Sequence, residues 1–286
     1  MSTVSPTELV RKTQDRVALP AIVSKLNELL TNPSSSAEDL IHIIKQDAAL
    51  SLNVLKVINS PFYDLPTNVD TLNMAVTILG TQQLRDLVTS TAIIREFSNH
   101  KKLVHFDLEP FWCHSITAAT AARMASLSIK QTDNEQYFVM GLLHDIGKMI
   151  MYLLFPAETK QLQTTLKKDP TAARNAEQNT FGIDHATLGA ELLNAWYFPE
   201  PVVAGVAQHH ALLADSQFST AAAITHLANV VANNLYTPVS IDDDNVLDPV
   251  ALDILDIEND KLEGIYEDTF KHMDDLLQLL YYDNLH

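Results

Sequence analysis

Glycine is scarce in this chain, and this scarcity constrains the fold more than any other single feature. Seven of the 286 residues are glycine, whereas globular proteins use about 7% glycine on average. β-Hairpins place glycine in their tight turns, and neither an Asn-Gly nor an Asp-Gly pair occurs in the sequence. Convincing alternation of apolar and polar residues with a period of two, which marks half-buried strands, is also absent over five or more residues. The sequence therefore disfavours sheet-rich folds.

Apolar residues recur instead at the spacing of one face of an α-helix. In residues 54–61, for example, this pattern ends at an Asn-Ser-Pro sequence, which stops a helix. The Asp-Pro pairs at 169–170 and 248–249 each place an N-cap residue before proline at the first helical position. Ser35 and Glu38 have the spacing of a capping box. These signals predict an all-α protein.

The helical segments fall into three parts. A polar break near residues 98–109 separates an N-terminal helical lobe, residues 1–105, from a second helical lobe, residues 106–235. The break is short, so we expect the two lobes to pack together rather than swing on a linker. Residues 236–286 are predicted to form an acidic helical extension that packs on this two-lobed module.

Negative charge is concentrated in that extension. The formal charge of the chain is −17, and residues 236–286 contain 14 acidic residues against two lysines. A negative surface repels nucleic-acid backbones and anionic membranes, so we expect neither as a partner. The two lobes are nearly balanced in charge, so a phosphate-bearing ligand is not excluded.

Other features predict a cytoplasmic protein. Residues 1–19 carry several charged side chains and no apolar core run, unlike a secretory signal. No stretch approaches the roughly 18 uninterrupted apolar residues of a membrane span. Cys113 is the single cysteine, which excludes an intrachain disulfide and suits a reducing compartment.

Five histidines between positions 114 and 210 are candidate metal ligands, together with the aspartate that follows one of them. They are His114, His144, Asp145, His185, His209 and His210. Neutral imidazole suits Fe, Mn and Zn, and a carboxylate can bridge two such ions. Spacing does not show that these side chains converge, so ordinary core or surface histidines remain an alternative. Lys148 either contacts a phosphate or is a solvated lysine at a helix end.

Residues 142–148, Leu-Leu-His-Asp-Ile-Gly-Lys, resemble the central signature of the HD superfamily of metal-dependent phosphohydrolases. The wider chain resembles one branch of that superfamily, the HDOD (HD-related output domain) family. The further matching segments are Asp47–Leu50, Asn59–Tyr63, Ala75–Gly80, Phe111–Ser115, Gly182–Ala190 and Trp196–Glu200. The resemblance implies two packed helical lobes with an HD-like helical bundle in the second, and a bacterial role in signal transduction.

The resemblance also implies roles for particular residues. In the related HD-GYP branch, which hydrolyses cyclic di-nucleotides, equivalent histidines and an aspartate hold the metals. By that pattern the six candidate ligands would bind one or two divalent ions (Fe, Mn, Zn or Mg), with Asp145 bridging them and Lys148 binding phosphate. Two departures weaken the implied catalysis. Asn229 stands where HD enzymes have a closing aspartate, and asparagine is a poorer ligand for a divalent cation. Pro110 replaces a glutamate found in some HD-GYP enzymes, whose Gly-Tyr-Pro signature is also missing.

Three functions therefore stay open, and the sequence does not decide whether the protein is an enzyme. The first is a regulatory output module that binds a signalling protein or a small nucleotide or phosphate ligand, with weak or no catalysis. The second is a metal-dependent phosphohydrolase acting on a nucleotide or cyclic di-nucleotide, with Asp145 and Lys148 as catalytic residues. The third is a metal-binding sensor without turnover. The oligomeric state is not readable from the sequence.

Overall fold

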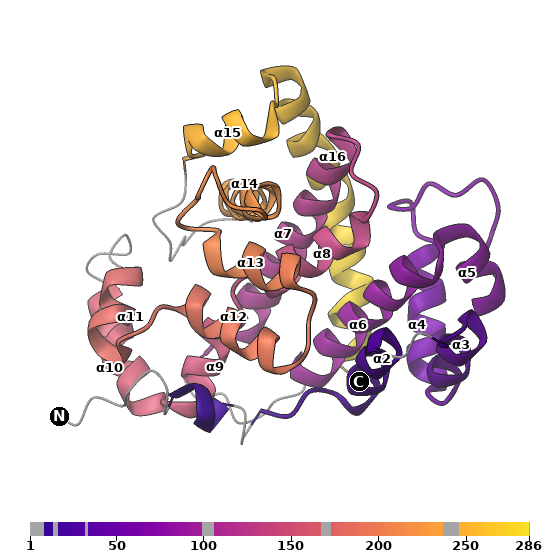
Figure 1. Cartoon of the computed structure of the whole chain (residues 1–286), viewed down its shortest axis with the longest axis horizontal. Helices are drawn as coiled ribbons and strands as arrows, with labels where there is room; N and C mark the ends of the chain where they lie inside the picture. Colours follow the sequence, from indigo (N-terminus) through magenta and orange to yellow (C-terminus); the bar gives the residue numbers. More distant parts are fainter. Residues whose placement is uncertain are drawn as a thin grey trace.

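The fold is all-α, as predicted (Figure 1). The computed structural model describes residues 9–13, 17–31, 34–98, 106–166, 173–236 and 246–285. Throughout these ranges the regular secondary structure is helical.

The N-terminal lobe is built around one long, buried helix. Its helices are α2 (Ala21–Thr31), α3 (Ala37–Lys45), α4 (Ala48–Ile58), α5 (Leu72–Leu79) and α6 (Thr81–Ser98). The first four all pack against α6, most of whose residues from 84 onward are buried. The helix therefore serves as the core of this lobe.

The capping box of α3 lies one residue later than predicted. Ser36, not Ser35, is the N-cap, and it exchanges hydrogen bonds with Asp39 rather than with Glu38. The Ser35 hydroxyl instead donates to the carbonyl oxygen of Leu29 at the end of α2. The cap lies at Ser36 because the Ser35 side chain is already hydrogen-bonded to the preceding helix.

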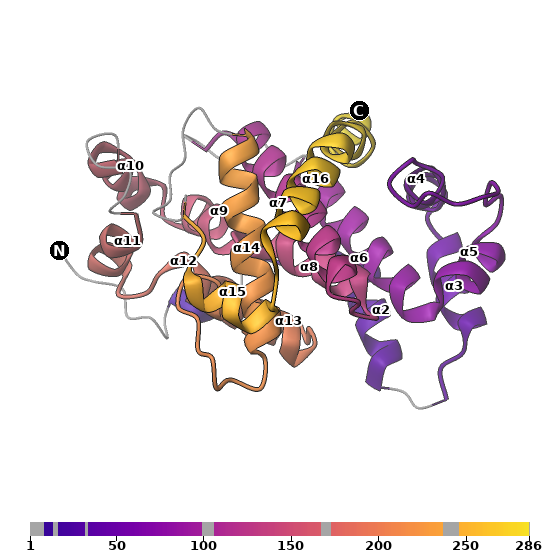
Figure 2. The same cartoon turned by 90° about the horizontal axis from the view of Figure 1, so that it is seen from above.

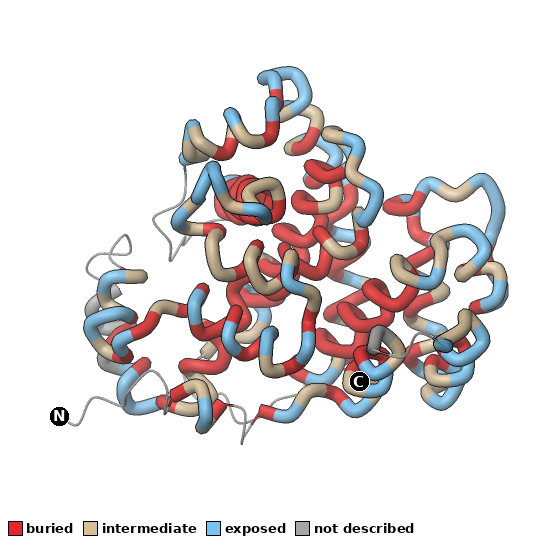
Figure 3. The backbone as a smooth tube through the Cα atoms, viewed as in Figure 1, coloured by how far each residue is buried: buried red, intermediate tan, exposed pale blue. Residues whose placement is uncertain are grey.

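The second lobe surrounds another long helix, α7 (Leu108–Ser128). The remaining helices of this lobe are α8 (Asn134–Leu143), α9 (Ile146–Leu154), α10 (Pro156–Leu166), α11 (Ala173–Phe181), α12 (His185–Ala195), α13 (Glu200–Gln208) and α14 (Ser219–Tyr236). Helices α8 and α14 pack along α7, and Figure 3 shows all three as largely buried.

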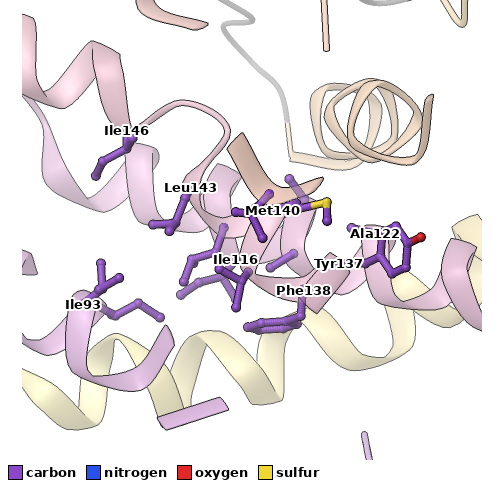
Figure 4. Close-up of a cluster of buried hydrophobic side chains, with 14 of the residues drawn as sticks. Ile93, Ile116, Ala122, Tyr137, Phe138, Met140, Leu143 and Ile146 are labelled. Atoms are coloured by element: carbon purple, nitrogen blue, oxygen red, sulfur yellow. The ribbon is translucent and has the colours of Figure 1, made fainter. Parts of the chain in front are cut away.

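The two lobes share one hydrophobic core. Figure 4 shows Ile93 of α6 in the same cluster as Ile116 of α7 and Leu143 of α8. All three side chains are fully buried, and α6 packs directly against α8. Hydrophobic burial at this contact stabilises the lobes as one packed body, as the short connection between them predicts.

The C-terminal extension crosses both lobes. It contains α15 (Pro249–Leu255), α16 (Asn259–Leu280) and a 3₁₀ turn at Tyr282–Asn284. Asp248 is the predicted N-cap of α15, and its carboxylate accepts a hydrogen bond from the Val250 amide. Helix α16 packs along α7 and also contacts α4 and α6 of the N-terminal lobe (Figure 2).

The predicted segment boundaries after residues 105 and 235 adjoin 99–105 and 237–245, which lie outside the described residues, and they stay predictions. The predicted N-cap at Asp169-Pro170 also lies outside them.

One segment, Asn134–Leu154, is long and apolar enough to cross a membrane by length and composition alone. It comprises α8 and α9, and 72% of its most apolar window is buried inside the fold. Buried helices in the core of a protein meet the same criteria of length and apolar composition.

Candidate metal centre

His144 and Asp145 lie at a break between two helices. His144 caps the end of α8, and Asp145 precedes α9 with a non-helical backbone (φ −102°, ψ 7°). Adjacent residues on a continuous helix point about 100° apart, so this break allows both side chains to reach one centre. The Nδ1 atom of His144 donates a 2.7 Å hydrogen bond to the carbonyl oxygen of Gly141. Its Nε2 atom is therefore left to act as an acceptor or metal ligand.

The first group of ligand-type residues consists of His114, His144 and Asp145. His114 comes from α7, and its Nε2 atom lies 3.2 Å from His144 Nε2. The Oδ2 atom of Asp145 lies 3.5 Å from His114 Nε2 and 3.4 Å from His144 Nε2. One ligand atom from each residue falls within 4.8 Å of the others, which is close enough to surround one ion.

The second group consists of His185, His209 and His210. His185 is the first residue of α12, and the other two follow the end of α13. The Nε2 atoms of His185 and His210 are 2.9 Å apart, and the ring centroids of His209 and His210 are 3.9 Å apart. The His209 Nε2 atom is buried without a hydrogen-bond partner. This group too has its ligand atoms within 4.8 Å of one another.

The Asp145 carboxylate belongs to the first group and also reaches the second. Its Oδ2 atom faces His114 and His144, and its Oδ1 atom lies 3.3 Å from His185 Nε2. Asp145 Oδ1 is buried and makes no hydrogen bond of good geometry. The six candidate ligands predicted from the sequence are thus brought together, with the Asp145 carboxylate in the middle.

Lys148 also reaches this cluster. Its Nζ atom lies 2.8 Å from Asp145 Oδ2, and the side chain is 13% exposed. Lys148 is therefore not a solvated lysine at a helix end.

Asn229 lies on α14, which packs against α7, the helix of His114, and against α13, which ends just before His209. Its Nδ2 atom is buried without a hydrogen-bond partner. Its place as a lost metal-ligand position stays a prediction.

The charge states of Asp145 and His209 suit cation binding. Burial raises the pKa of Asp145, but the nearby His144 and Lys148 outweigh it and hold that pKa well below its usual value. Burial, together with the neighbouring histidines His210 and His144, lowers the pKa of His209 well below its usual value. An ionised carboxylate and a neutral imidazole are the forms that bind divalent metals.

Glu177, a buried residue of α11, contacts this cluster although it is not among the residues predicted from the sequence. Its Oε2 atom accepts hydrogen bonds from the His185 ring and from the His185 backbone amide. Burial lowers the pKa of His185, but the negative charge of Glu177 outweighs it and raises that pKa. Glu177 is one of 36 acidic residues in the chain, and its sequence context carries no signal that marks it.

Gly147 belongs to the signature at residues 142–148, but the sequence does not show why a glycine is needed at this position. A Cβ atom at this position would lie 2.0 Å from the carbonyl oxygen of His185. The absence of a side chain therefore allows α9 to approach the start of α12, which places Asp145 beside His185.

The donor set fits two divalent cations. Imidazole nitrogens and a carboxylate between them suit Fe, Mn or Zn. Two ligand atoms of the cluster, His209 Nε2 and Asp145 Oδ1, are buried without a hydrogen-bond partner, and a bound cation would satisfy both. Cations bound here would polarise a phosphoryl oxygen and lower the pKa of bound water.

Comparison with known proteins shows the family and the fold of this chain. The profile of the HDOD domain family matches residues 17–212. An uncharacterised protein of Treponema pallidum (strain Nichols) is 25% identical over 211 residues, which cover 72% of this chain and 40% of that protein. The chain thus spans less than half the length of this relative.

Three solved structures share the fold. A candidate phosphohydrolase from Shewanella amazonensis SB2B superposes with a TM-score of 0.74 at 23% identity, covering 97% of this chain and 98% of that one. A candidate metal-dependent phosphohydrolase from the same organism gives 0.67 at 20% identity, with 94% and 96% covered. An HDOD domain protein of unknown function from Geobacter sulfurreducens gives 0.67 at 21% identity, with 94% and 92% covered.

Proposed function

The chain belongs to the HDOD family, and from this premise we propose that it is a bacterial, cytoplasmic signalling protein whose second lobe binds two divalent metal ions. Through these ions and Lys148 it recognises a phosphate-bearing ligand such as a nucleotide. The observation that carries the proposal is the position of Asp145, which directs one carboxylate oxygen toward each histidine group. A buried carboxylate is costly unless it is paired, and two metal ions would add to the pairing that Lys148 already supplies to Asp145.

The exposure of the cluster shows from which side a ligand would reach it. His144, His185 and His209 are fully buried, and Asp145 is 2% exposed. The remaining members, His114, His210 and Lys148, are partly exposed, so a ligand would approach from their side. HD enzymes have an aspartate at the position that corresponds to Asn229, so this chain has one negative charge fewer than such an enzyme there. We therefore propose a regulatory module with weak or no catalysis.

A metal-dependent phosphohydrolase is the second candidate. It is favoured by the 2.8 Å contact between Lys148 Nζ and Asp145 Oδ2. This contact places the ammonium group of Lys148 beside the carboxylate that would orient an attacking water. In that case Lys148 would stabilise the negative charge of the phosphate, and Asp145 would hold the water. The third candidate function is a metal-binding sensor without turnover.

Metal analysis tests the proposal. Protein purified without chelator and loaded with Mn or Fe is expected to hold close to two ions per chain, and the His144→Ala variant fewer. His42 is exposed on α3, so His42→Ala is the matched control and should retain both ions. A wild type that holds less than about a tenth of an equivalent would contradict the metal centre.

Activity then separates the candidates. The metal-loaded protein is incubated with cyclic di-nucleotides and with generic phosphodiester substrates. Turnover that disappears in the Lys148→Ala variant would support the phosphohydrolase. Metal binding without turnover would support the regulatory module or the sensor, and these two differ in whether a nucleotide binds to the loaded protein. Asn229→Asp should raise metal affinity, because it would return a carboxylate to the predicted closing position.

A further inference from the structure

Glu177 contacts the second histidine group without being one of its ligands. It lies on α11, eight residues before His185, and is 4% exposed. Its Oε2 atom accepts a 2.7 Å hydrogen bond from His185 Nδ1 and a 2.9 Å hydrogen bond from the His185 backbone amide. One carboxylate oxygen therefore fixes both the ring and the backbone at the start of α12.

This bond determines which ring nitrogen of His185 faces the cluster. Because Nδ1–H donates a hydrogen bond to the Glu177 carboxylate, the lone pair of the ring lies on Nε2 whenever the ring is neutral. That atom lies 3.3 Å from Asp145 Oδ1 and 2.9 Å from His210 Nε2. A carboxylate on the outer nitrogen also increases the basicity of the inner one, as in carboxylate–histidine–metal arrangements.

The support of His185 differs from that of two other buried histidines in the cluster. The Nδ1 atoms of His144 and His209 donate to backbone carbonyl oxygens, those of Gly141 and Val206, each at 2.7 Å. Carbonyl groups are neutral, and each of these two belongs to the helix that its histidine caps. Glu177 is charged and comes from a different helix.

We infer that Glu177 is a positioning residue for His185, and that the affinity of the second group for metal depends on the placement of α11. The inference rests on the proposed metal centre. Loss of Glu177 frees the His185 ring to rotate and leaves its Nδ1 proton unpaired in a buried site. The ion held by His185, His209 and His210 is then bound more weakly, whereas the ion at His114 and His144 is retained.

Three variants test this inference. Glu177→Ala removes the acceptor, and Glu177→Gln keeps an oxygen acceptor but removes the charge. Glu191 is an exposed carboxylate on α12, so Glu191→Gln is the charge-matched control. Each protein is titrated with Co²⁺ after metal removal, and the stoichiometry, both dissociation constants and the visible Co²⁺ spectrum are measured. Circular dichroism of the metal-free proteins shows whether each variant is folded.

We expect the second ion to bind about 10- to 100-fold more weakly to Glu177→Ala than to the wild type, with Glu177→Gln in between. The first ion and Glu191→Gln should match the wild type. Equal loss of both ions in Glu177→Ala, or wild-type affinity for both, would overturn the inference while leaving the metal centre in place. A wild type that binds no Co²⁺ would overturn the metal centre, and the inference with it.

Discussion

The Tyr63 hydroxyl donates a 2.8 Å hydrogen bond to Glu135 Oε2, joining the loop after α4 to the start of α8. Glu135 is fully buried, and its other oxygen accepts a 2.6 Å hydrogen bond from Arg123 Nε of α7. The Arg123 guanidinium also lies 4.7 Å from the centre of the Tyr63 ring. The N-terminal lobe is thus attached to α7, which contains His114, and to α8, which ends just before His144.

Removing the Tyr63 hydroxyl should weaken this attachment. Tyr63→Phe leaves a buried carboxylate oxygen without its donor, so we expect the free energy of unfolding to fall by about 1–3 kcal/mol. Urea denaturation followed by circular dichroism measures the change. Tyr197 is 78% exposed, so Tyr197→Phe serves as the control and should change stability by less than about 0.5 kcal/mol. Equal effects of the two substitutions would show that the bond to Glu135 contributes nothing.

Two glycine substitutions should have opposite effects. A Cβ atom at Gly147 would collide with the His185 carbonyl oxygen at 2.0 Å, whereas a Cβ atom at Gly264 on α16 would meet nothing within 4 Å. We expect Gly147→Ala to push α9 away from α12, lowering the melting temperature and the metal content together. Gly264→Ala should stabilise the protein by about 0.4–1 kcal/mol, because alanine favours helix. A Gly147→Ala protein with wild-type stability and metal content would contradict the close approach of the two helices.

Stability should depend on pH through Asp47. This residue caps α4 and pairs with Arg95 of α6, and the hydrogen bond from Arg95 lowers the pKa of Asp47 below its usual value. The pair therefore stabilises the fold fully above about pH 4, the unfolded pKa. This contribution is lost as the pH falls through the lower folded pKa.

Asp47→Asn keeps a good N-cap residue but removes the charge. We expect it to be about 0.5–1 kcal/mol less stable than the wild type at pH 6, with the difference shrinking toward pH 3. Urea denaturation at both pH values measures this, and Arg95→Gln should behave in the same way. A difference that is the same at pH 6 and pH 3 would contradict the ion pair.

His226 should hold the C-terminal extension against the metal centre. Its Nδ1 atom donates to the carbonyl oxygen of His209 at 2.9 Å, and its Nε2 atom accepts from the Asp248 amide at 3.0 Å. His226→Phe removes both bonds, so the Asp248 amide should exchange with solvent about 5- to 150-fold faster, as a loss of about 1–3 kcal/mol implies. Hydrogen exchange followed by NMR measures this rate. His42→Phe, at an exposed position, is the control, and an unchanged rate in His226→Phe would refute the contact.

Much of the fold could be predicted from local signals. The scarcity of glycine and the helical spacing of apolar residues indicated an all-α chain, and all regular secondary structure in the described ranges is helical. The cap at Asp248 followed from the Asp-Pro pair. The cap at Ser36 was displaced by one residue, because the sequence does not show that Ser35 bonds to the preceding helix.

The sequence by itself determined which chemistry is present, because residue type fixes the ligand atoms and the His-Asp string marks where two of them adjoin. Tertiary structure alone decided that Asp145 lies between His144 and His185, forty residues farther along the chain. It also selected Glu177 from many similar carboxylates, because only packing buries that residue against His185. Contacts between distant residues depend on how helices pack, and this packing is a property of the whole core rather than of any local segment.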